Sequence, residues 1–275
     1  MLTDLHLHLR PDDLDARAQD HFTVENVDRY RTVAQERGIA ELGVSEHIYR
    51  FRQALDVWQH PFWRENAVDD LEAYCDFVTG ETDLRLGVEA DFVPGREDRT
   101  ASLLEAYPFD YVVGSVHFLS DGAVDHPDYD VWERSSSAEA VWRRYFETLG
   151  EAARSGLFDI LAHPDLVKVW GAGRPRPEGD PRRYYELAMD GIVESQLAIE
   201  VSTAGLRKPA AEIYPAPAFL QMCLEAGCAV ALSSDAHRPG QIGDRYEQAL
   251  ELLDGLGVTQ LSVFEARVQH LEPIG

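Results

Sequence analysis

Short apolar runs alternate with amphipathic helical segments along almost the whole chain, and this alternation strongly limits the fold. The strand-like runs are DLHLHL, ELGVSEH, LRLGVEADF, YVVGSVHFL, DILAHPDL, LAIEVST and AVALSSDAH. Helical patterns separate them; one begins at Val24 and stops at Gly38, and another places Ser136 and Glu139 in capping-box spacing. Strands that alternate with helices form parallel sheets. Seven or eight such units in about 250 residues favour a single (β/α) barrel domain that spans residues 1–275.

The composition fits one globular, cytoplasmic domain and argues against several classes of partner. Of the 275 residues, 45% are hydrophobic, and no apolar run is long enough for a membrane span. Asp4 and His6 interrupt the N-terminal run too early for a signal segment. The cysteines are Cys75, Cys223 and Cys228, which form no CxxC pair and are expected to be reduced. The net charge of −24 disfavours a nucleic-acid surface, so we expect neither nucleic acid nor membrane as a partner.

Polar side chains gather where the predicted strands end. In the first strand, alternation places Asp4, His6 and His8 on one face and the intervening leucines on the other. Residues two apart on a strand are about 7 Å apart, so both imidazoles can reach one metal ion. Carboxyl ends of barrel strands form the rim where catalytic groups converge. The other strand ends carry Glu46, His47, Glu89, His117, His163, Asp235 and His237.

Imidazoles and carboxylates together are ligands for zinc, manganese or iron. Six histidines and two or three carboxylates exceed the needs of one tetrahedral ion, so we expect two to three divalent metal ions that share a carboxylate bridge. Such clusters generate hydroxide at neutral pH and bind the oxygens of a phosphoryl group. The sequence contains no GxxxxGK[ST] and no GxGxxG motif, which removes the common nucleotide-binding alternatives.

The motifs HxH, SEH, GVEADF, GSVH, AHPD and SSDAH, in this order, resemble the PHP (polymerase and histidinol phosphatase) family from residue 4 to about 240. Within that family, YVVGSVHFL, DILAHPDLVK, EVSTAGLRKP followed by YP, and SSDAH are most similar to the histidinol-phosphate phosphatases. The resemblance implies a distorted, TIM-like (β/α)7 barrel of PHP type with a trinuclear metal site.

The same resemblance assigns ligands to three ions. The first ion would be held by His6, His8, Glu89 and Asp235. Glu89 would bridge to a second ion, held also by His117 and His163, while His47 and His237 would hold the third. The third site needs one more ligand, from the loop LRPDDLD, which is shorter than the family's; Asp12 is our choice and Asp13 the alternative. Glu89, Asp235 and His237 are the residues expected to carry catalysis.

Cations near these motifs are candidates for phosphate binding. Only two lysines, Lys168 and Lys208, occur beside 23 arginines, and both follow strand-end motifs. Arg207 is the stronger candidate because a planar guanidinium binds phosphate through two hydrogen bonds, and Arg10 follows the first strand. The Pro/Gly-rich stretch 171–183 is either a cationic lid or an ordinary loop.

Carboxylates beside the ligand histidines are expected to orient the rings. These are Glu46, Asp165 and Glu200. Three further histidines lie outside any motif and are expected at the surface: His60, His126 and His270.

Together these features predict a metal-dependent phosphomonoesterase in which a metal-bound hydroxide attacks phosphorus. Within the family that the motifs resemble, the best substrate is L-histidinol phosphate, whose amine also suits an acidic protein. The alternatives are a phosphatase for another small phosphomonoester, such as a nucleotide or sugar phosphate, and a polymerase-associated module. A barrel amidohydrolase fits poorly because Lys168 is misplaced for a lysine ligand. The identity of the metals and the oligomeric state stay open.

Overall fold

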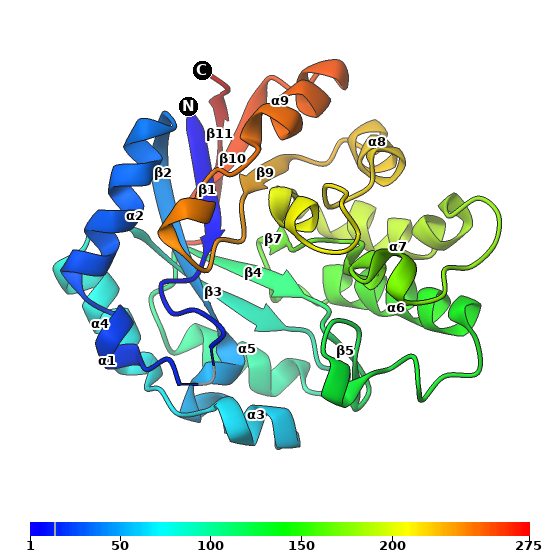
Figure 1. Cartoon of the computed structure of the whole chain (residues 1–275), viewed down its shortest axis with the longest axis horizontal. Helices are drawn as coiled ribbons and strands as arrows, with labels where there is room; N and C mark the ends of the chain where they lie inside the picture. The colour runs from blue at the N-terminus through cyan, green and yellow to red at the C-terminus, as the bar shows by residue number, and fades with distance from the viewer. Residues whose placement is uncertain (14) are drawn as a thin grey trace.

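The computed structural model describes residues 1–13 and 15–275, and within these the main sheet has seven parallel strands (Figure 1). Their order in the sheet follows their order in the chain: β1 (Leu2–Leu7), β2 (Ile39–His47), β3 (Arg85–Asp91), β4 (Tyr111–Ser115), β7 (Ile160–Leu161), β8 (Ala198–Ser202) and β9 (Val230–Ser233). A bridge between Leu7 and Ala236 joins the first strand to the chain after the last, so the barrel is nearly closed. The predicted distorted (β/α)7 barrel is confirmed.

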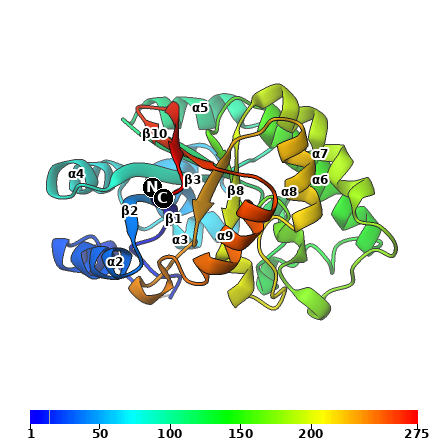
Figure 2. The same ribbon diagram turned by 90° about the horizontal axis from the view of Figure 1, so that it is seen from above.

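Helices surround this sheet, as the view from above shows (Figure 2). They are α1 (Ala18–His21), α2 (Val24–Glu36), α3 (Pro61–Asn66), α4 (Leu71–Glu81), α5 (Glu97–Glu105), α6 (Ala138–Arg154), α7 (Arg182–Ser195), α8 (Pro217–Glu225) and α9 (Tyr246–Gly255). Gly38, with a φ of 70°, follows the end of α2 as predicted. The cap of α6 is Ser137, whose side chain accepts from Ala140 N, and not Ser136 as the capping-box spacing predicted.

Short elements fill the connections, and most of them carry no periodic signal in the sequence. The 3₁₀ helices are η1 (Ile48–Arg50), η2 (Arg52–Asp56), η3 (Pro127–Tyr129), η4 (Leu166–Lys168), η5 (Gly171–Gly173), η6 (Thr203–Arg207) and η7 (Pro239–Gln241). Two antiparallel hairpins were not predicted: β5 (Phe118–Leu119) with β6 (Gly122–Ala123), and β10 (Gln260–Glu265) with β11 (Val268–Pro273).

The strand β1 departs from simple alternation. Its pairing with β2 shifts between Asp4 and Leu7, which marks a bulge. Within the bulge, Leu5 joins the cluster inside the barrel, whereas Leu7 belongs to the larger core under the helices. Asp4 instead accepts hydrogen bonds from the backbone of Ser234 and Gly243. The prediction that Asp4 shares a face with His6 and His8 is therefore wrong, because an extra residue in the strand reverses the pattern.

The barrel interior is packed at the end where the strands begin. Tyr111, at the start of β4, fills this end, and a Cβ added at Gly43 or Gly87 would overlap its ring. Phe264 of β10 packs in the same cluster, with its ring centre 6.2 Å from that of Tyr111. The opposite end, where the strands finish, is left for polar side chains.

Two further predictions concern cysteines and membranes. All three cysteines are free, as predicted. Among the described residues, no helix is long and apolar enough to span a membrane.

Candidate metal centre

Glu89, at the end of β3, lies at the middle of the polar cluster and is 1% exposed. Its Oε1 lies 3.1 Å from Nε2 of His163 and 3.4 Å from Nε2 of His117. Its Oε2 lies 3.3 Å from Nε2 of His6 and 3.6 Å from Nε2 of His8. The two oxygens of one carboxylate thus face two separate groups of imidazoles, which is the arrangement that a bridging ligand requires.

Asp235 closes the first of these groups from the turn after β9. Its Oδ1 lies 3.4 Å from Nε2 of His8 and 3.9 Å from Nε2 of His6. The ligand atoms of these three residues lie within 4.8 Å of one another, and so do those of His6, Glu89 and His163. Each group could therefore hold one ion.

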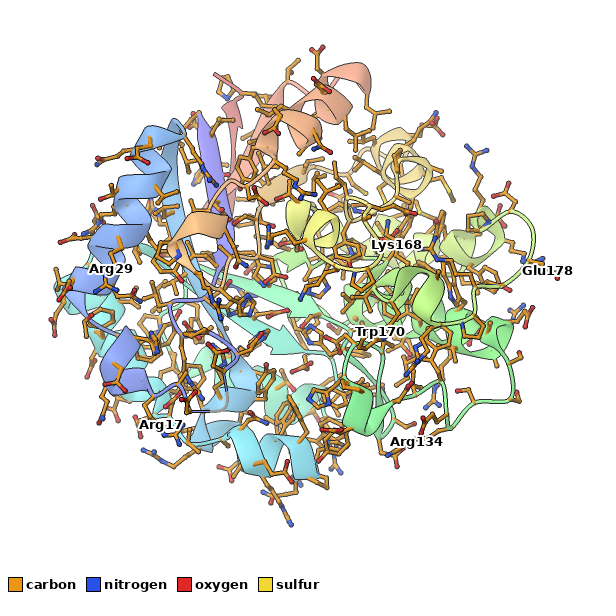
Figure 3. All side chains as sticks on the ribbon, viewed as in Figure 1. Arg17, Arg29, Arg134, Lys168, Trp170 and Glu178 are labelled. Atoms are coloured by element: carbon orange, nitrogen blue, oxygen red, sulfur yellow. The ribbon has the colours of Figure 1, made fainter. Side chains whose placement is uncertain are left out.

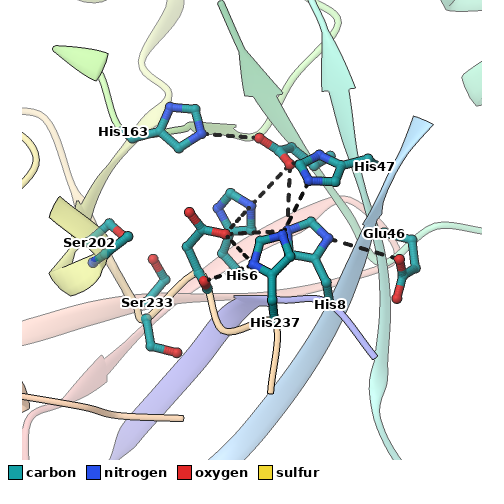
Figure 4. Close-up of polar contacts among 12 residues, drawn as sticks. His6, His8, Glu46, His47, His163, Ser202, Ser233 and His237 are labelled. Carbon is teal, nitrogen blue, oxygen red and sulfur yellow. Dashed lines mark hydrogen bonds and ion pairs between the residues drawn. The ribbon is translucent and has the colours of Figure 1, made fainter. Parts of the chain in front are cut away.

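A third group forms where His47, at the end of β2, meets His237. Their Nε2 atoms are 3.4 Å apart, and the rings of His6, His8, His47 and His237 point toward one another (Figure 4). Asp12 reaches the same place: its Oδ2 lies 3.1 Å from Nε2 of His237, and its Oδ1 lies 3.8 Å from Nε2 of His47.

The alternative ligand of this third group, Asp13, points elsewhere. It pairs with Arg238 at 3.2 Å. Of the two neighbouring aspartates in the loop, only Asp12 approaches the histidines, so Asp12 stays our candidate.

Unpaired buried atoms show that the cluster suits metal ions. Nε2 of His6 and both ring nitrogens of His8 are buried and have no hydrogen-bond partner among the described residues. Buried polar atoms almost always have partners, so these need an explanation. Imidazole nitrogens and carboxylate oxygens in this arrangement match the ligands of divalent transition metals.

Further carboxylates fix two of the ring orientations. Glu200 Oε1 lies 2.6 Å from Nδ1 of His6, and Ser233 Oγ donates to the same oxygen. Asp91 Oδ1 lies 2.7 Å from Nδ1 of His117. A carboxylate that accepts the Nδ1 proton leaves the lone pair of Nε2 free for a metal ion.

Two carboxylates near the histidines differ from what the sequence predicted. Asp91 was not predicted, although it lies two residues after Glu89 and so shares its side of β3. Asp165 bonds Lys168 and the backbone of Ala216 instead of a ring, so the expectation that it orients a histidine is wrong.

The charges in the cluster keep its carboxylates ionised. Burial alone raises the pKa of Glu89, but His47, His6 and His117 outweigh this effect and hold the pKa well below its usual range. Burial and repulsion from His47 and His237 lower the pKa of His8 well below its ordinary value. Burial opposes protonation of His6, but Glu200, Glu89 and Asp235 outweigh this effect and raise its pKa well above the ordinary value, so a metal ion that binds there would displace a proton.

Backbone strain marks two of the candidate ligand positions. His163 has a φ of 25° and Asp235 a φ of 49°, values that are uncommon outside glycine. Both residues lie in turns directly after barrel strands. Strained backbone of this kind costs about 1–3 kcal/mol per residue and is concentrated at functional sites.

The candidate phosphate-binding cations have differing environments. Arg207, in η6, donates through Nη2 to the backbone carbonyls of Ser234 and Asp235. Arg10 lines the pocket, but its guanidinium pairs with Asp69. Lys208 lines the pocket and is exposed.

Lys168 has the environment of a structural residue. It is 3% exposed, and its Nζ lies 2.8 Å from Asp165, 3.2 Å from Glu212 and 2.8 Å from the carbonyl oxygen of Ile213. It does not line the pocket. The turn η4 directs the side chain away from the centre, and spacing along the sequence does not indicate such a turn.

The stretch 171–183 does not cover the pocket. Trp170 is the last pocket-lining residue before it, and none of the residues 171–183 lines the cavity. Arg174 pairs with Asp130, and Arg176 with Glu212. In Figure 3, Glu178 lies at the outer edge of the molecule, whereas Trp170 lies nearer its middle. The stretch is therefore not a lid in this structure: it runs from η5 through an outer loop into the start of α7.

The centre opens into a cavity of about 780 Å³. Aromatic rings lead away from the histidines: Tyr49 stacks on His47 at 4.7 Å, and Phe62 follows at 4.9 Å from Tyr49. Phe62 of α3 meets Phe118 of β5 across this wall, and Figure 1 shows the two elements side by side. The wall also carries three carboxylates, Glu65, Asp125 and Asp128.

Two of the histidines expected at the surface help to build this wall. His126 lines the cavity, and its ring lies 5.1 Å from that of Phe62. His60 is 5% exposed and stacks on Trp58. Neither lies in a repeating pattern, so the sequence carries no signal of this packing; only His270 is exposed as predicted.

Fold and site together define a (β/α) barrel with a histidine- and carboxylate-lined centre suited to several metal ions. The PHP domain family matches residues 19–204. A probable histidinol-phosphatase of Deinococcus radiodurans is 34% identical over 235 residues, which cover 83% of this chain and 86% of that protein. The chain therefore belongs to the PHP family.

Two other known proteins support this assignment. The histidinol-phosphatase of Bacillus subtilis is 29% identical over 187 residues, 62% of this chain and 70% of that protein. The crystal structure of histidinol phosphate phosphatase from Lactococcus lactis, complexed with zinc, L-histidinol and phosphate, superposes with a TM-score of 0.75. It covers 98% of both chains at 18% identity, which supports the shared fold.

Proposed function

We propose that the chain is a metal-dependent phosphomonoesterase that hydrolyses L-histidinol phosphate to L-histidinol and phosphate. The observation that carries the proposal is the position of Glu89 between two groups of histidines, with a third group beside it. Bound divalent ions would supply a hydroxide nucleophile at neutral pH and would neutralise charge on the phosphoryl oxygens. The structure of the Lactococcus relative, whose name states its substrate, contains zinc together with L-histidinol and phosphate, the two products of that hydrolysis.

The chain's own residues prepare this centre. Glu200 and Asp91 accept the Nδ1 protons of His6 and His117, so that the opposite nitrogens face the centre. Arg207 donates hydrogen bonds to the carbonyl oxygens of Ser234 and Asp235 and so fixes the turn that presents the Asp235 carboxylate. Lys208, exposed on the cavity rim, is our candidate for attracting the phosphate dianion.

The wall away from the histidines fits the leaving group. Histidinol carries a planar imidazole and an ammonium group. Aromatic rings such as Phe62 and Tyr129 offer faces for the imidazole, and the carboxylates Glu65, Asp125 and Asp128 offer negative charge for the ammonium group. A sugar phosphate or a nucleotide, whose leaving group carries no ammonium group, would leave these carboxylates without a cation, which disfavours the alternative substrates.

The test is phosphate release from a panel of phosphomonoesters by the metal-loaded protein. The panel contains histidinol phosphate, its analogue without the amine, a sugar phosphate and a nucleoside monophosphate. We expect the highest kcat/KM for histidinol phosphate, and a higher KM for the analogue. Preference for the sugar phosphate or the nucleotide would overturn the substrate assignment.

A pair of variants links this preference to the wall. Asp125→Asn removes a pocket carboxylate and should raise KM for histidinol phosphate but not for the analogue without the amine. Asp121→Asn is the matched control, because Asp121 pairs with Arg134 and does not line the cavity.

A further inference from the structure

Arg50 is a buried arginine beside the candidate centre. It ends η1, three residues after His47, and is 2% exposed. Its Nη1 donates to Glu46 Oε2 and to the carbonyl oxygen of Arg10, 2.7 Å away. Its Nη2 donates to Asp12 Oδ1. One guanidinium therefore joins the end of β2 to the loop that follows β1.

The Glu46–Arg50 pair holds the backbone that leads to Asp12. Glu46 Oε1 accepts from the backbone N–H groups of Leu9 and Arg10, at 2.7 Å and 3.0 Å. Arg50 binds the carbonyl oxygen of Arg10 from the other side. One ion pair thus binds two backbone donors and one backbone acceptor of this short segment, which ends two residues before Asp12.

The same guanidinium divides the work of the two Asp12 oxygens. Oδ1 pairs with Arg50, whereas Oδ2 lies 3.1 Å from Nε2 of His237 and faces the third group. The Asp12 side chain is 59% exposed, so little packing restricts its rotamers. Without Arg50, an exposed loop carboxylate would have to give up its rotational freedom to bind an ion.

We propose that Arg50 is the positioning residue of the third metal site: it fixes Asp12 as a ligand through Oδ2 alone and thereby sets how tightly the third ion binds. The inference rests on the metal centre of the proposed function. Partners that orient metal ligands typically contribute 10–100-fold in affinity.

The experiment measures bound metal directly. Chelator-treated protein is dialysed against a series of Mn²⁺ concentrations, and manganese per chain is determined by elemental analysis. Arg50→Lys keeps the positive charge beside Glu46 but removes the second branch of the fork that reaches Asp12. We expect wild type to bind three ions, and Arg50→Lys to bind two with unchanged affinity and the third at least about tenfold more weakly.

The control is Arg52→Lys. Arg52 lies two residues along the same segment, is exposed, and pairs with Asp70 away from the histidines. It should bind all three ions as wild type does, and circular dichroism checks that each variant is folded. Wild-type binding of the third ion in Arg50→Lys would overturn the proposal, and so would a change in KM for histidinol phosphate without any change in metal binding.

A double-mutant cycle separates positioning from general destabilisation. Asp12→Asn should weaken the same ion, and adding Arg50→Lys to it should cause no further loss. Additive losses would overturn the proposal, because Arg50 would then act independently of Asp12. Histidinol phosphate hydrolysis, measured in wild type, tests the proposed function separately: an active enzyme with unchanged third-ion binding in Arg50→Lys refutes only the positioning role.

Discussion

A single carboxylate, Glu89, contacts histidines from four different strand ends. His6, His47, His117 and His163 lie on β1, β2 and the turns after β4 and β7, and all of them approach its two oxygens. Burial would raise the pKa of Glu89 and neutralise it, but the histidines keep it ionised. The charge of one buried side chain thus depends on the whole set, so its removal has effects beyond one contact.

Glu89→Gln keeps the shape of this side chain and removes its charge. We expect hydrolysis of histidinol phosphate to fall by at least about 10³-fold, because activation by the metal ions and binding of the phosphoryl group are lost together. Metal analysis should show fewer bound ions. Glu147→Gln, on the exposed side of α6, is the control, and near-wild-type activity in Glu89→Gln would show that the bridge is misassigned.

Arg207 makes backbone contacts that its sequence motif does not reveal. The Arg207 guanidinium holds the Asp235 turn. Arg207→Ala should therefore lower kcat/KM by a factor that corresponds to about 2–4 kcal/mol of activation free energy, and should weaken metal binding about tenfold. Arg207→Lys should recover part of both, since one ammonium group cannot replace the planar fork. Full metal binding together with lost activity would point instead to a direct phosphate contact.

At the scale of elements, strand ends were predictable, whereas side-chain partners mostly were not; the contact of Glu200 with His6 is the exception. His6, His8, His47 and Glu89 lie in short apolar runs whose ends are visible in the sequence, and the parallel barrel brings these ends together. Arg50 follows His47 in a 3₁₀ turn, which has no periodic signal.

The bulge in β1 also had no signal in the sequence. It depends on the register with β2, which the sequence of one strand does not specify. The C-terminal hairpin also went unpredicted, since its outer strand β11 is mostly exposed and lacks alternation.

This hairpin closes the barrel at the end away from the metal centre, and it can be tested there. Phe264 is 3% exposed and packs on Tyr111, so Phe264→Ala should lower the free energy of unfolding by about 3–5 kcal/mol. Chemical denaturation measures the change. Leu271→Ala, at a position 49% exposed on β11, should change it by no more than about 0.5 kcal/mol. Equal effects of the two substitutions would contradict this account of barrel closure.

At the scale of the whole molecule, the net charge of −24 opposes the approach of a phosphate dianion. Raising ionic strength from about 0.01 M to about 0.1 M shortens the screening length from about 30 Å to about 10 Å. We therefore expect a non-coordinating salt to lower KM for p-nitrophenyl phosphate, and to do so less for histidinol phosphate, whose ammonium group offsets part of its charge. Steady-state kinetics at both salt concentrations measure this, and a KM that rises for both substrates would contradict it.

The central claim is that this barrel hydrolyses histidinol phosphate through a centre of several metal ions. The most direct measurement removes the metal with a chelator, returns it in steps, and follows bound equivalents and phosphate release from histidinol phosphate in the same samples. We predict no turnover by the metal-free protein and full turnover once two to three equivalents are bound. Turnover that persists in the metal-free protein, or a fully loaded and folded protein that releases no phosphate from histidinol phosphate, would contradict the account.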